Sequence, residues 1–245
     1  MSLAIVLTFV GGLAFGSFLG LTTFRLPRGR AYLTGRSFCP NCGTKIAWYD
    51  NIPIVSFLLL KGRCRHCHKK ISWRYPLIEL ATATTFLAIY LKFGLDIPLL
   101  IVSLLTITVF VIDLEKRIIP DEIVFFGYLI TLAFLVFGPF PAFYSYLFAG
   151  FFSSFFLLTV HLLTKGRGMG LGDVKYALFV GTFLGWPYSL VWLFLAFLTG
   201  AALGSILVLL RKAKFGRQIA FGPFLAAAFF ISLFLAENLL RWFLT

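Results

Sequence analysis

Apolar stretches separated by short polar segments run along almost the whole chain. A helix needs about 17–25 mostly apolar residues to cross a bilayer, and several of these stretches approach that length. We predict spans at 3–24, 76–93, 97–112, 122–138, 142–164, 174–186, 188–210 and 220–240. Gly181, Gly185 and Pro187 predict a tight turn between the sixth and seventh spans. The pattern therefore predicts an all-α fold, a polytopic membrane helical bundle of about eight transmembrane helices.

The composition excludes an ordinary soluble domain. Of the 245 residues, 60% are hydrophobic and only 13% are charged, which is about half the charged share of typical soluble domains. So few charged residues leave too little polar surface for a water-soluble protein of this size. The solvent of most of this chain is therefore expected to be lipid.

The positive charges occur in alternate connections between the predicted spans. Basic residues of membrane proteins collect on the cytoplasmic side, so the net charge of +13 is interpreted as topology, and no nucleic-acid partner is expected. The opposite connections carry only Lys92 and Arg241. We therefore predict that both termini lie outside the cytoplasm. The connections predicted to be cytoplasmic are 25–75, 113–121, 165–175 and 211–217.

The four cysteines lie in the one sizeable polar segment, as two C-x-x-C pairs: Cys39 with Cys42, and Cys64 with Cys67. Four thiolates with this spacing are typical of a tetrahedral structural zinc site. A reducing cytoplasm disfavours disulfides, and bound zinc would supply folding energy to a segment with a small core. A redox dithiol and a site without a ligand remain open. His66 and His68 are expected outside the metal's ligand set.

These features divide the chain into three parts. Residues 1–24 are apolar without a basic start, so they are expected to be a retained first transmembrane helix, not a cleaved leader. Residues 25–75 are expected to form a small cytoplasmic tetra-Cys zinc-binding module. Residues 76–245 are expected to form the remaining transmembrane bundle.

Two acidic residues are expected at the same membrane boundary. Asp113 ends the third predicted span on its cytoplasmic side, and Asp173 precedes the sixth. Two carboxyl groups held close together share one proton, so that one activates water while the other polarises a carbonyl. Gly170 and Gly172 allow the backbone to approach a substrate strand closely or to adopt a positive φ. The alternative is that each Asp caps a helix or pairs with a nearby cation.

Other polar residues leave their roles open. Glu79 lies just inside the second span, where it is a candidate to hold a loop through a charge pair or to be a structural acid near the membrane boundary. Lys175 is a candidate for substrate binding or for a surface position. His161 is expected to be a helix-packing residue, and Asp121, which follows Pro120, a helix N-cap.

In this order the motifs resemble the type IV prepilin peptidases, a family of membrane aspartyl enzymes with a GxGD motif. The resemblance covers nearly the whole chain, and the order of its motifs makes it specific. Besides the C-x-x-C pairs, it is carried by Phe15-Gly-Ser-Phe-Leu19, Arg25-Leu-Pro27, Asn51-Ile-Pro53, Arg63-Cys-Arg65, Trp73-Arg-Tyr-Pro-Leu-Ile-Glu79, Asp113 with Ile119-Pro-Asp121, Gly170-Leu-Gly-Asp-Val-Lys175 and Phe221-Gly-Pro-Phe-Leu225.

The resemblance implies a bacterial inner-membrane enzyme that cleaves the basic leader of type IV prepilins or pseudopilins at the cytoplasmic face. It implies Asp113 and Asp173 as the catalytic pair and the four cysteines as ligands of a structural Zn²⁺. It also implies methylation of the new amino terminus with S-adenosylmethionine as the methyl donor, and contact with this donor is a third role open to Glu79. Membrane lipid is an expected partner, because the pilin's apolar helix can enter from the bilayer.

Two other classes of function are alternatives to this one. A small membrane transporter would use the buried carboxylates to carry ions, but it should show two matched halves with broken helices, and no such repeat occurs in the sequence. A zinc-anchored membrane adaptor without chemistry would not need two acids at one depth.

Overall fold

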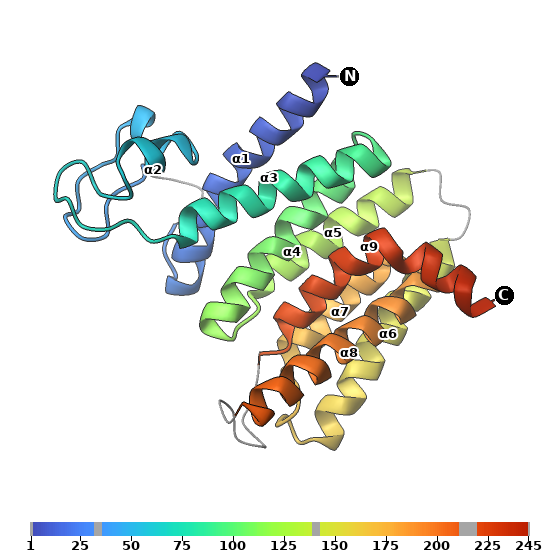
Figure 1. Ribbon diagram of the computed structural model, residues 1–245. Coiled ribbons are helices and arrows are strands. Elements are labelled where there is room, and N and C mark those ends of the chain that lie inside the picture. Colours follow the sequence, from blue (N-terminus) through green and yellow to red (C-terminus); the bar gives the residue numbers. More distant parts are fainter. Residues whose placement is uncertain (1, 32–35, 139–142, 211–219, 245) are drawn as a thin grey trace. The chain divides into compact units, whose positions relative to one another are not determined.

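The computed structural model describes residues 2–31, 36–138, 143–210 and 220–244 (Figure 1). Within these ranges the chain is helical and contains no β-strand, only two isolated β-bridges. The long helices are α1 (Ser2–Arg25), α3 (Arg74–Phe93), α4 (Ile97–Lys116), α5 (Asp121–Phe137), α6 (Phe143–Leu163), α7 (Leu171–Leu184), α8 (Tyr188–Leu209) and α9 (Gly222–Leu244). The predicted all-α class is confirmed, and each predicted span corresponds to a long helix.

Six of these helices, α1, α3, α4, α6, α8 and α9, are long and apolar enough to cross a membrane. By contrast, α5 has 17 residues and α7 has 14, so at 1.5 Å per residue they are only about 26 Å and 21 Å long. The eight-span topology therefore stays a prediction for α5 and α7. The basic connection 211–217 lies outside the described residues.

The chain forms two compact units, Met1–Thr108 and Val109–Thr245. In the first, α1 and α3 lie side by side (Figure 1) and are antiparallel, with glycines of α1 spaced four apart at the contact. A Cβ on Gly12 would lie 2.6 Å from the Ala83 Cα, and one on Gly16 would lie 2.6 Å from the Glu79 Cα. Small residues at this spacing let helix backbones approach closely in a membrane.

Arginine side chains fix the end of this helix pair that lies next to the polar segment. Arg74, at the start of α3, donates to the Gly20 carbonyl and the Thr23 hydroxyl of α1, at 3.1 and 2.7 Å. Arg25, the last residue of α1, is buried and donates to the Arg36 carbonyl at 3.0 Å. The Arg74 bonds therefore join the two helices, and the Arg25 bond attaches the polar segment to α1.

In the second unit, α7 is the most enclosed helix. It packs against α5, α6, α8 and α9, and Tyr176, Phe179 and Val180 are fully buried. A helix surrounded by protein need not match the bilayer thickness, which is consistent with the short length of α7. Gly185, at φ +72, ends α7 three residues before α8 begins, so the predicted tight turn is confirmed.

Candidate functional site

Asp113 lies in the last turn of α4 and is only 4% exposed. The backbone amide of Gly222, which begins α9, lies beside its carboxyl group. Even so, the buried Oδ2 atom has no hydrogen-bond partner in the described part of the chain. A Cβ on Gly222 would lie 2.6 Å from this oxygen, so only glycine leaves room for the carboxyl at this position. The buried Oδ2 atom therefore retains its capacity to accept a hydrogen bond.

Asp173 lies in the first turn of α7 and is 7% exposed. Its Oδ2 atom accepts a hydrogen bond of 3.0 Å from the backbone N–H of Gly170, the residue that precedes the helix. This is the carboxylate half of a capping box. The sequence therefore folds the GxGD segment so that the helix start itself orients the Asp173 side chain.

Asp113 and Asp173 lie near enough to each other for the charge of Asp113 to act on the Asp173 carboxyl. Ile119, in the loop between α4 and α5, packs against Gly172, which precedes Asp173, and against Gly222, which lies beside Asp113. A Cβ on Gly172 would lie 3.1 Å from the Ile119 Cβ, and one on Gly222 would lie 3.2 Å from its Cδ1. The ends of α4, α7 and α9 thus meet at one apolar side chain beside the acidic pair.

Neither Gly170 nor Gly172 has the positive φ that was one of the two expectations for these glycines. Gly170 has a φ of −83°, and Gly172 is absent from the residues with positive φ, so neither needs the left-handed conformation. A side chain at Gly172 would instead press on Ile119, with its Cβ 3.1 Å from the Ile119 Cβ. Gly170 contributes a backbone N–H to Asp173, which any residue except proline would also supply.

His161 has a role that sequence reasoning missed. Its Nδ1 lies 2.7 Å from the Met169 carbonyl oxygen, and because that oxygen can only accept, the ring N–H donates. The same peptide group donates its N–H, that of Gly170, to Asp173. One peptide plane therefore connects His161 to Asp173. The sequence alone offered no signal beyond the position of His161 near the loop.

The end of α6 holds this loop in a defined shape. The Gly166 N–H donates to the His161 carbonyl at 2.8 Å, with Lys165 and Gly166 at φ +50 and +73. This is a Schellman-type helix end. The Thr164 hydroxyl also accepts the Gly168 N–H at 3.1 Å. The loop that carries Met169 and Gly170 is therefore attached to the last turn of α6 at several points.

Lys175 and Asp121 form an exposed ion pair, with Nζ to Oδ1 and Oδ2 distances of 2.8 and 2.9 Å. The expectation that Asp121 is an N-cap is wrong: Pro120 is the cap residue, and Asp121 is the first residue of α5. Its carboxylate connects the start of α5 to the start of α7. Lys175 is therefore engaged by Asp121, and its predicted role in substrate binding stays a prediction.

Glu79 belongs to the other compact unit. It is 8% exposed, and its Oε2 accepts a 2.8 Å hydrogen bond from the backbone N–H of Ile54. Ile54 has a positive φ of 59° and precedes the short helix α2 (Val55–Leu59). Of the roles left open for Glu79, holding a loop is the one that this hydrogen bond supports.

The four cysteines form one cluster, with ligand atoms that all lie within 4.8 Å of one another. The Cys39 and Cys67 sulfurs are 3.9 Å apart, close to the roughly 3.8 Å that tetrahedral Zn–S bonds of about 2.3 Å require. Hydrogen bonding to the Thr44 side chain and backbone lowers the pKa of the Cys42 thiol to about 6, which favours the thiolate that binds metal. The residues therefore fit zinc, with neither histidine in the cluster.

The two C-x-x-C pairs fold into matching knuckles. In the first knuckle the backbone carbonyl of Cys39 accepts a 2.9 Å hydrogen bond from the Gly43 N–H. In the second, the carbonyl of Cys64 accepts one of 3.0 Å from the His68 N–H. An isolated bridge closes each turn, Phe38 with Lys45 and Arg63 with Lys70. Gly43 and His68 occupy equivalent positions, with φ of +71 and +56. The second knuckle therefore places a histidine where the backbone favours glycine.

His68→Gly is expected to stabilise the second knuckle by about 0.5–1 kcal/mol, because it removes the strain of a positive φ. Zinc release to a chelator from the purified protein should slow accordingly. Gly43→Ala is the matched control with the opposite sign: its Cβ meets no atom within 4 Å, but its φ becomes strained. Equal release rates for His68→Gly and the parent protein would contradict the expectation.

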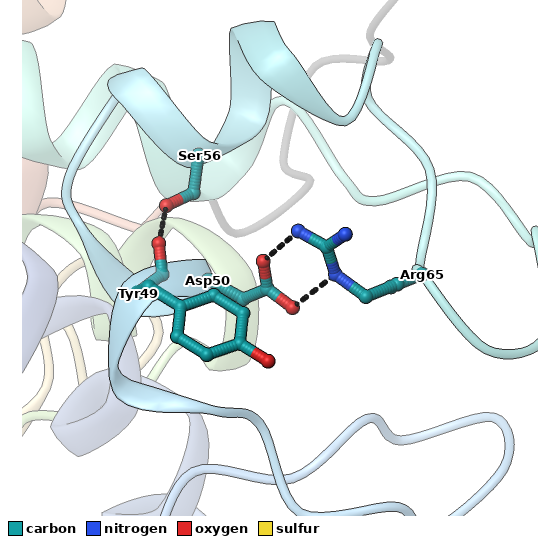
Figure 2. A network of polar contacts seen from close by, with 4 residues as sticks. All are labelled: Tyr49, Asp50, Ser56 and Arg65. Atoms are coloured by element: carbon teal, nitrogen blue, oxygen red, sulfur yellow. Dashed lines mark hydrogen bonds and ion pairs between the residues drawn. The ribbon is translucent and has the colours of Figure 1, made fainter.

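An ion pair attaches the second knuckle to the turn η2 (Trp48–Asn51) (Figure 2). Asp50 binds the Arg65 guanidinium through two hydrogen bonds of 2.8 and 2.6 Å, and this pairing holds the pKa of the Asp50 carboxyl below its usual range. The Ser56 hydroxyl donates to the Tyr49 carbonyl at 2.9 Å, which connects α2 to the same turn. The knuckle, the turn and α2 thus form one small structure.

These features define a helical membrane protein with a four-Cys cluster and a pair of buried acids at helix ends. The chain matches two family models: the Bacterial Peptidase A24 N-terminal domain at residues 10–93, and the Type IV leader peptidase family at residues 99–205. The chain therefore belongs to the type IV leader peptidase family. All four cysteines lie in the first match, and both acids lie in the second.

Curated relatives cover nearly the full length. The chain is 34% identical to a prepilin leader peptidase/N-methyltransferase of Aeromonas hydrophila, over 98% of this chain and 93% of that protein. It is 34% identical to a protein of the same description from Pseudomonas aeruginosa, over 99% and 94%. For one from Bacillus subtilis the identity is 30%, over 96% of both chains. No solved structure matches the chain. Membership of this family, together with the apolar helices, identifies an inner-membrane protein.

Proposed function

We propose that this chain cleaves the basic leader of type IV prepilins or pseudopilins and then methylates the new amino terminus. Family membership and the names of the full-length relatives support both activities. The observation that carries the peptidase assignment is the presence of two buried acids, Asp113 and Asp173, within electrostatic range of each other in the region that matches the leader peptidase model. A transporter or an inert adaptor is not favoured by this family.

In the proposed reaction the two carboxyl groups approach each other and share one proton, because two like charges at close range resist joint ionisation. The ionised carboxyl takes a proton from water, whose oxygen forms a bond to the scissile carbonyl carbon. The protonated carboxyl donates a hydrogen bond to the carbonyl oxygen. The C–N bond then breaks, and a proton passes to the departing amine. The unpartnered Oδ2 atom of Asp113 is suited to hold either the shared proton or the water.

The four cysteines would hold a structural Zn²⁺, which when bound supplies folding energy to the polar module. All four positions would be filled by thiolates, so no coordination position stays open for catalysis. S-adenosylmethionine is the proposed methyl donor, by resemblance to the bifunctional members of the family. The proposed division is 1–24 as the first span, 25–75 as the zinc module and 76–245 as the peptidase bundle.

The proposed orientation places the active site and zinc module in the cytoplasm and both termini outside. The charge distribution supports it, since Lys and Arg gather in alternate connections. A reporter enzyme that folds only outside the cytoplasm should be active when it is fused to either terminus. A reporter that folds only in the cytoplasm should be inactive at both termini, and its activity at either one would overturn the orientation.

The function is tested with the purified full-length chain in lipid nanodiscs, a pilin peptide with a basic leader, and S-adenosylmethionine. Mass measurement should find a shortened peptide that carries one added methyl group. Omission of the methyl donor should leave the shortened, unmethylated peptide. An uncut peptide under conditions where the protein is folded would refute the peptidase assignment, and cleavage without methylation would refute the second activity.

His161 is expected to position Asp173 through the Met169–Gly170 peptide. His161→Leu removes the donor and should lower kcat by about 10- to 100-fold, as small misplacements of a catalytic group do, with little change in KM. His161→Asn keeps a donor near the Nδ1 position and should restore most of the rate. If both variants lost the same activity, or if KM alone changed, a positioning role would be contradicted.

A further inference from the structure

Helix α2 presents its apolar side chains outward and its polar side chain inward. Val55, Leu58 and Leu59 are 48%, 64% and 77% exposed, and their spacing places them on one face of the helix. Ser56, in contrast, is buried and donates to the Tyr49 carbonyl (Figure 2). This arrangement is the reverse of a water-soluble surface helix. We refer to Val55, Leu58 and Leu59 as the α2 surface.

The start of α2 lies beside α3, a helix long and apolar enough to span the membrane, at a point past the first turn of α3. The Ile54 N–H, which precedes α2, donates to Glu79 at 2.8 Å. Glu79 lies five residues into α3, which begins at Arg74, so this contact lies about 7.5 Å along the helix from its start. Phe57 of α2 packs on Trp73 with ring centroids 4.8 Å apart. The short helix is therefore folded back along the end of α3.

The surroundings of the α2 surface match the boundary between lipid and water. Trp48 and Trp73 are 76% and 67% exposed, and such aromatic residues gather at membrane interfaces. The residues after α2 are basic and exposed: Lys61, Arg63, Lys69 and Lys70. Residues 25–75 contain eleven Lys and Arg but a single acid, Asp50.

We propose that the α2 surface inserts into the interfacial layer of the anionic cytoplasmic leaflet, with the basic residues of the second knuckle on the lipid headgroups. The proposal rests on the cytoplasmic orientation proposed above. Charge complementarity selects this occupant: a strongly basic segment attracts anionic lipid but repels both a basic leader peptide and a second basic module. Lipid contact would hold the zinc knuckles at the membrane, where the leader leaves the bilayer.

The test uses the full-length chain in nanodiscs, with a photoreactive phenylalanine analogue at Leu59 or at Asn41. Asn41 is an exposed polar residue of the first knuckle and is the matched control. After irradiation, mass spectrometry should find lipid adducts at position 59, several-fold more than at position 41. The yield at position 59 should also be several-fold higher with phosphatidylglycerol in the disc than with phosphatidylcholine alone.

Adducts at position 59 with a second copy of the chain, or with added pilin peptide in place of lipid, would overturn the proposal. Equal lipid labelling at both positions, or equal yields in the two lipid mixtures, would do the same. Leu59→Gln provides a second measurement: hydrogen exchange in residues 55–60 should rise several-fold in anionic discs. Cleavage of the pilin peptide is measured in the same samples, so that failure of the lipid contact is distinguished from failure of the peptidase assignment.

Discussion

Asp113→Asn and Asp173→Asn, made separately, are each expected to abolish leader removal while the protein still inserts in the membrane and binds zinc. Asparagine has nearly the same shape as aspartate but cannot share or transfer the proton that the reaction needs. Loss of one general acid or base lowers a rate by about 10²–10⁴-fold. The measurement is the initial rate of cleavage of a basic-leader pilin peptide, followed by mass.

Asp96→Asn is the matched control for these variants. Asp96 precedes α4, the helix that carries Asp113, and accepts the Leu99 N–H at 3.0 Å as a helix cap. Asparagine caps a helix about as well as aspartate, so this variant should cleave at the parent rate. Retained cleavage in either of the first two variants would remove that residue from the catalytic pair.

The second large effect is expected in the polar module. Cys42→Ser and Cys67→Ser should release the metal and unfold the knuckles, because structural zinc contributes on the order of 10 kcal/mol to the folding of small metal domains. Metal content per chain is measured by elemental analysis, and folding of residues 36–75 by limited proteolysis in nanodiscs. Both variants should lose zinc and become sensitive to protease within this segment.

His66→Gln distinguishes four thiolate ligands from a mixed set. His66 lies between Cys64 and Cys67 but outside the cluster, so its replacement should leave one zinc per chain. Loss of zinc from this variant, or full zinc retention by either cysteine variant, would contradict the four-Cys site. Purified parent protein without zinc would contradict the metal assignment altogether.

Sequence periodicity anticipated the helices but not how closely some of them pack. Apolar runs predicted each long helix, because a segment in lipid must satisfy its own backbone. The close contact between α1 and α3 at Gly12 and Gly16 was not predicted. Small residues also occur at 200–205 of α8: Gly200 packs against Phe221 and Phe224, whereas Ala201 and Ala202 are exposed and Gly204 has no neighbour within 4 Å of its Cβ position. Small-residue spacing alone does not identify which helix face is buried.

The two candidate acids could be selected from the sequence, but the groups that surround them could not. Asp113 and Asp173 stood out because acids are rare in so apolar a chain. The surrounding groups are Gly222, Ile119 and the Met169–Gly170 peptide held by His161. They come from segments far apart in the sequence, and their roles depend on backbone positions that carry no side-chain signature.

The sequence by itself determined the helical membrane class, the four-Cys cluster and the two candidate acids. Each of these follows from residue type and spacing along one segment. Only the tertiary structure decided that Asp121 engages Lys175, that Glu79 holds the start of α2, and that one peptide plane joins His161 to Asp173. The physical reason is that hydrogen bonds between distant segments depend on distances of a few ångströms, which local periodicity does not encode.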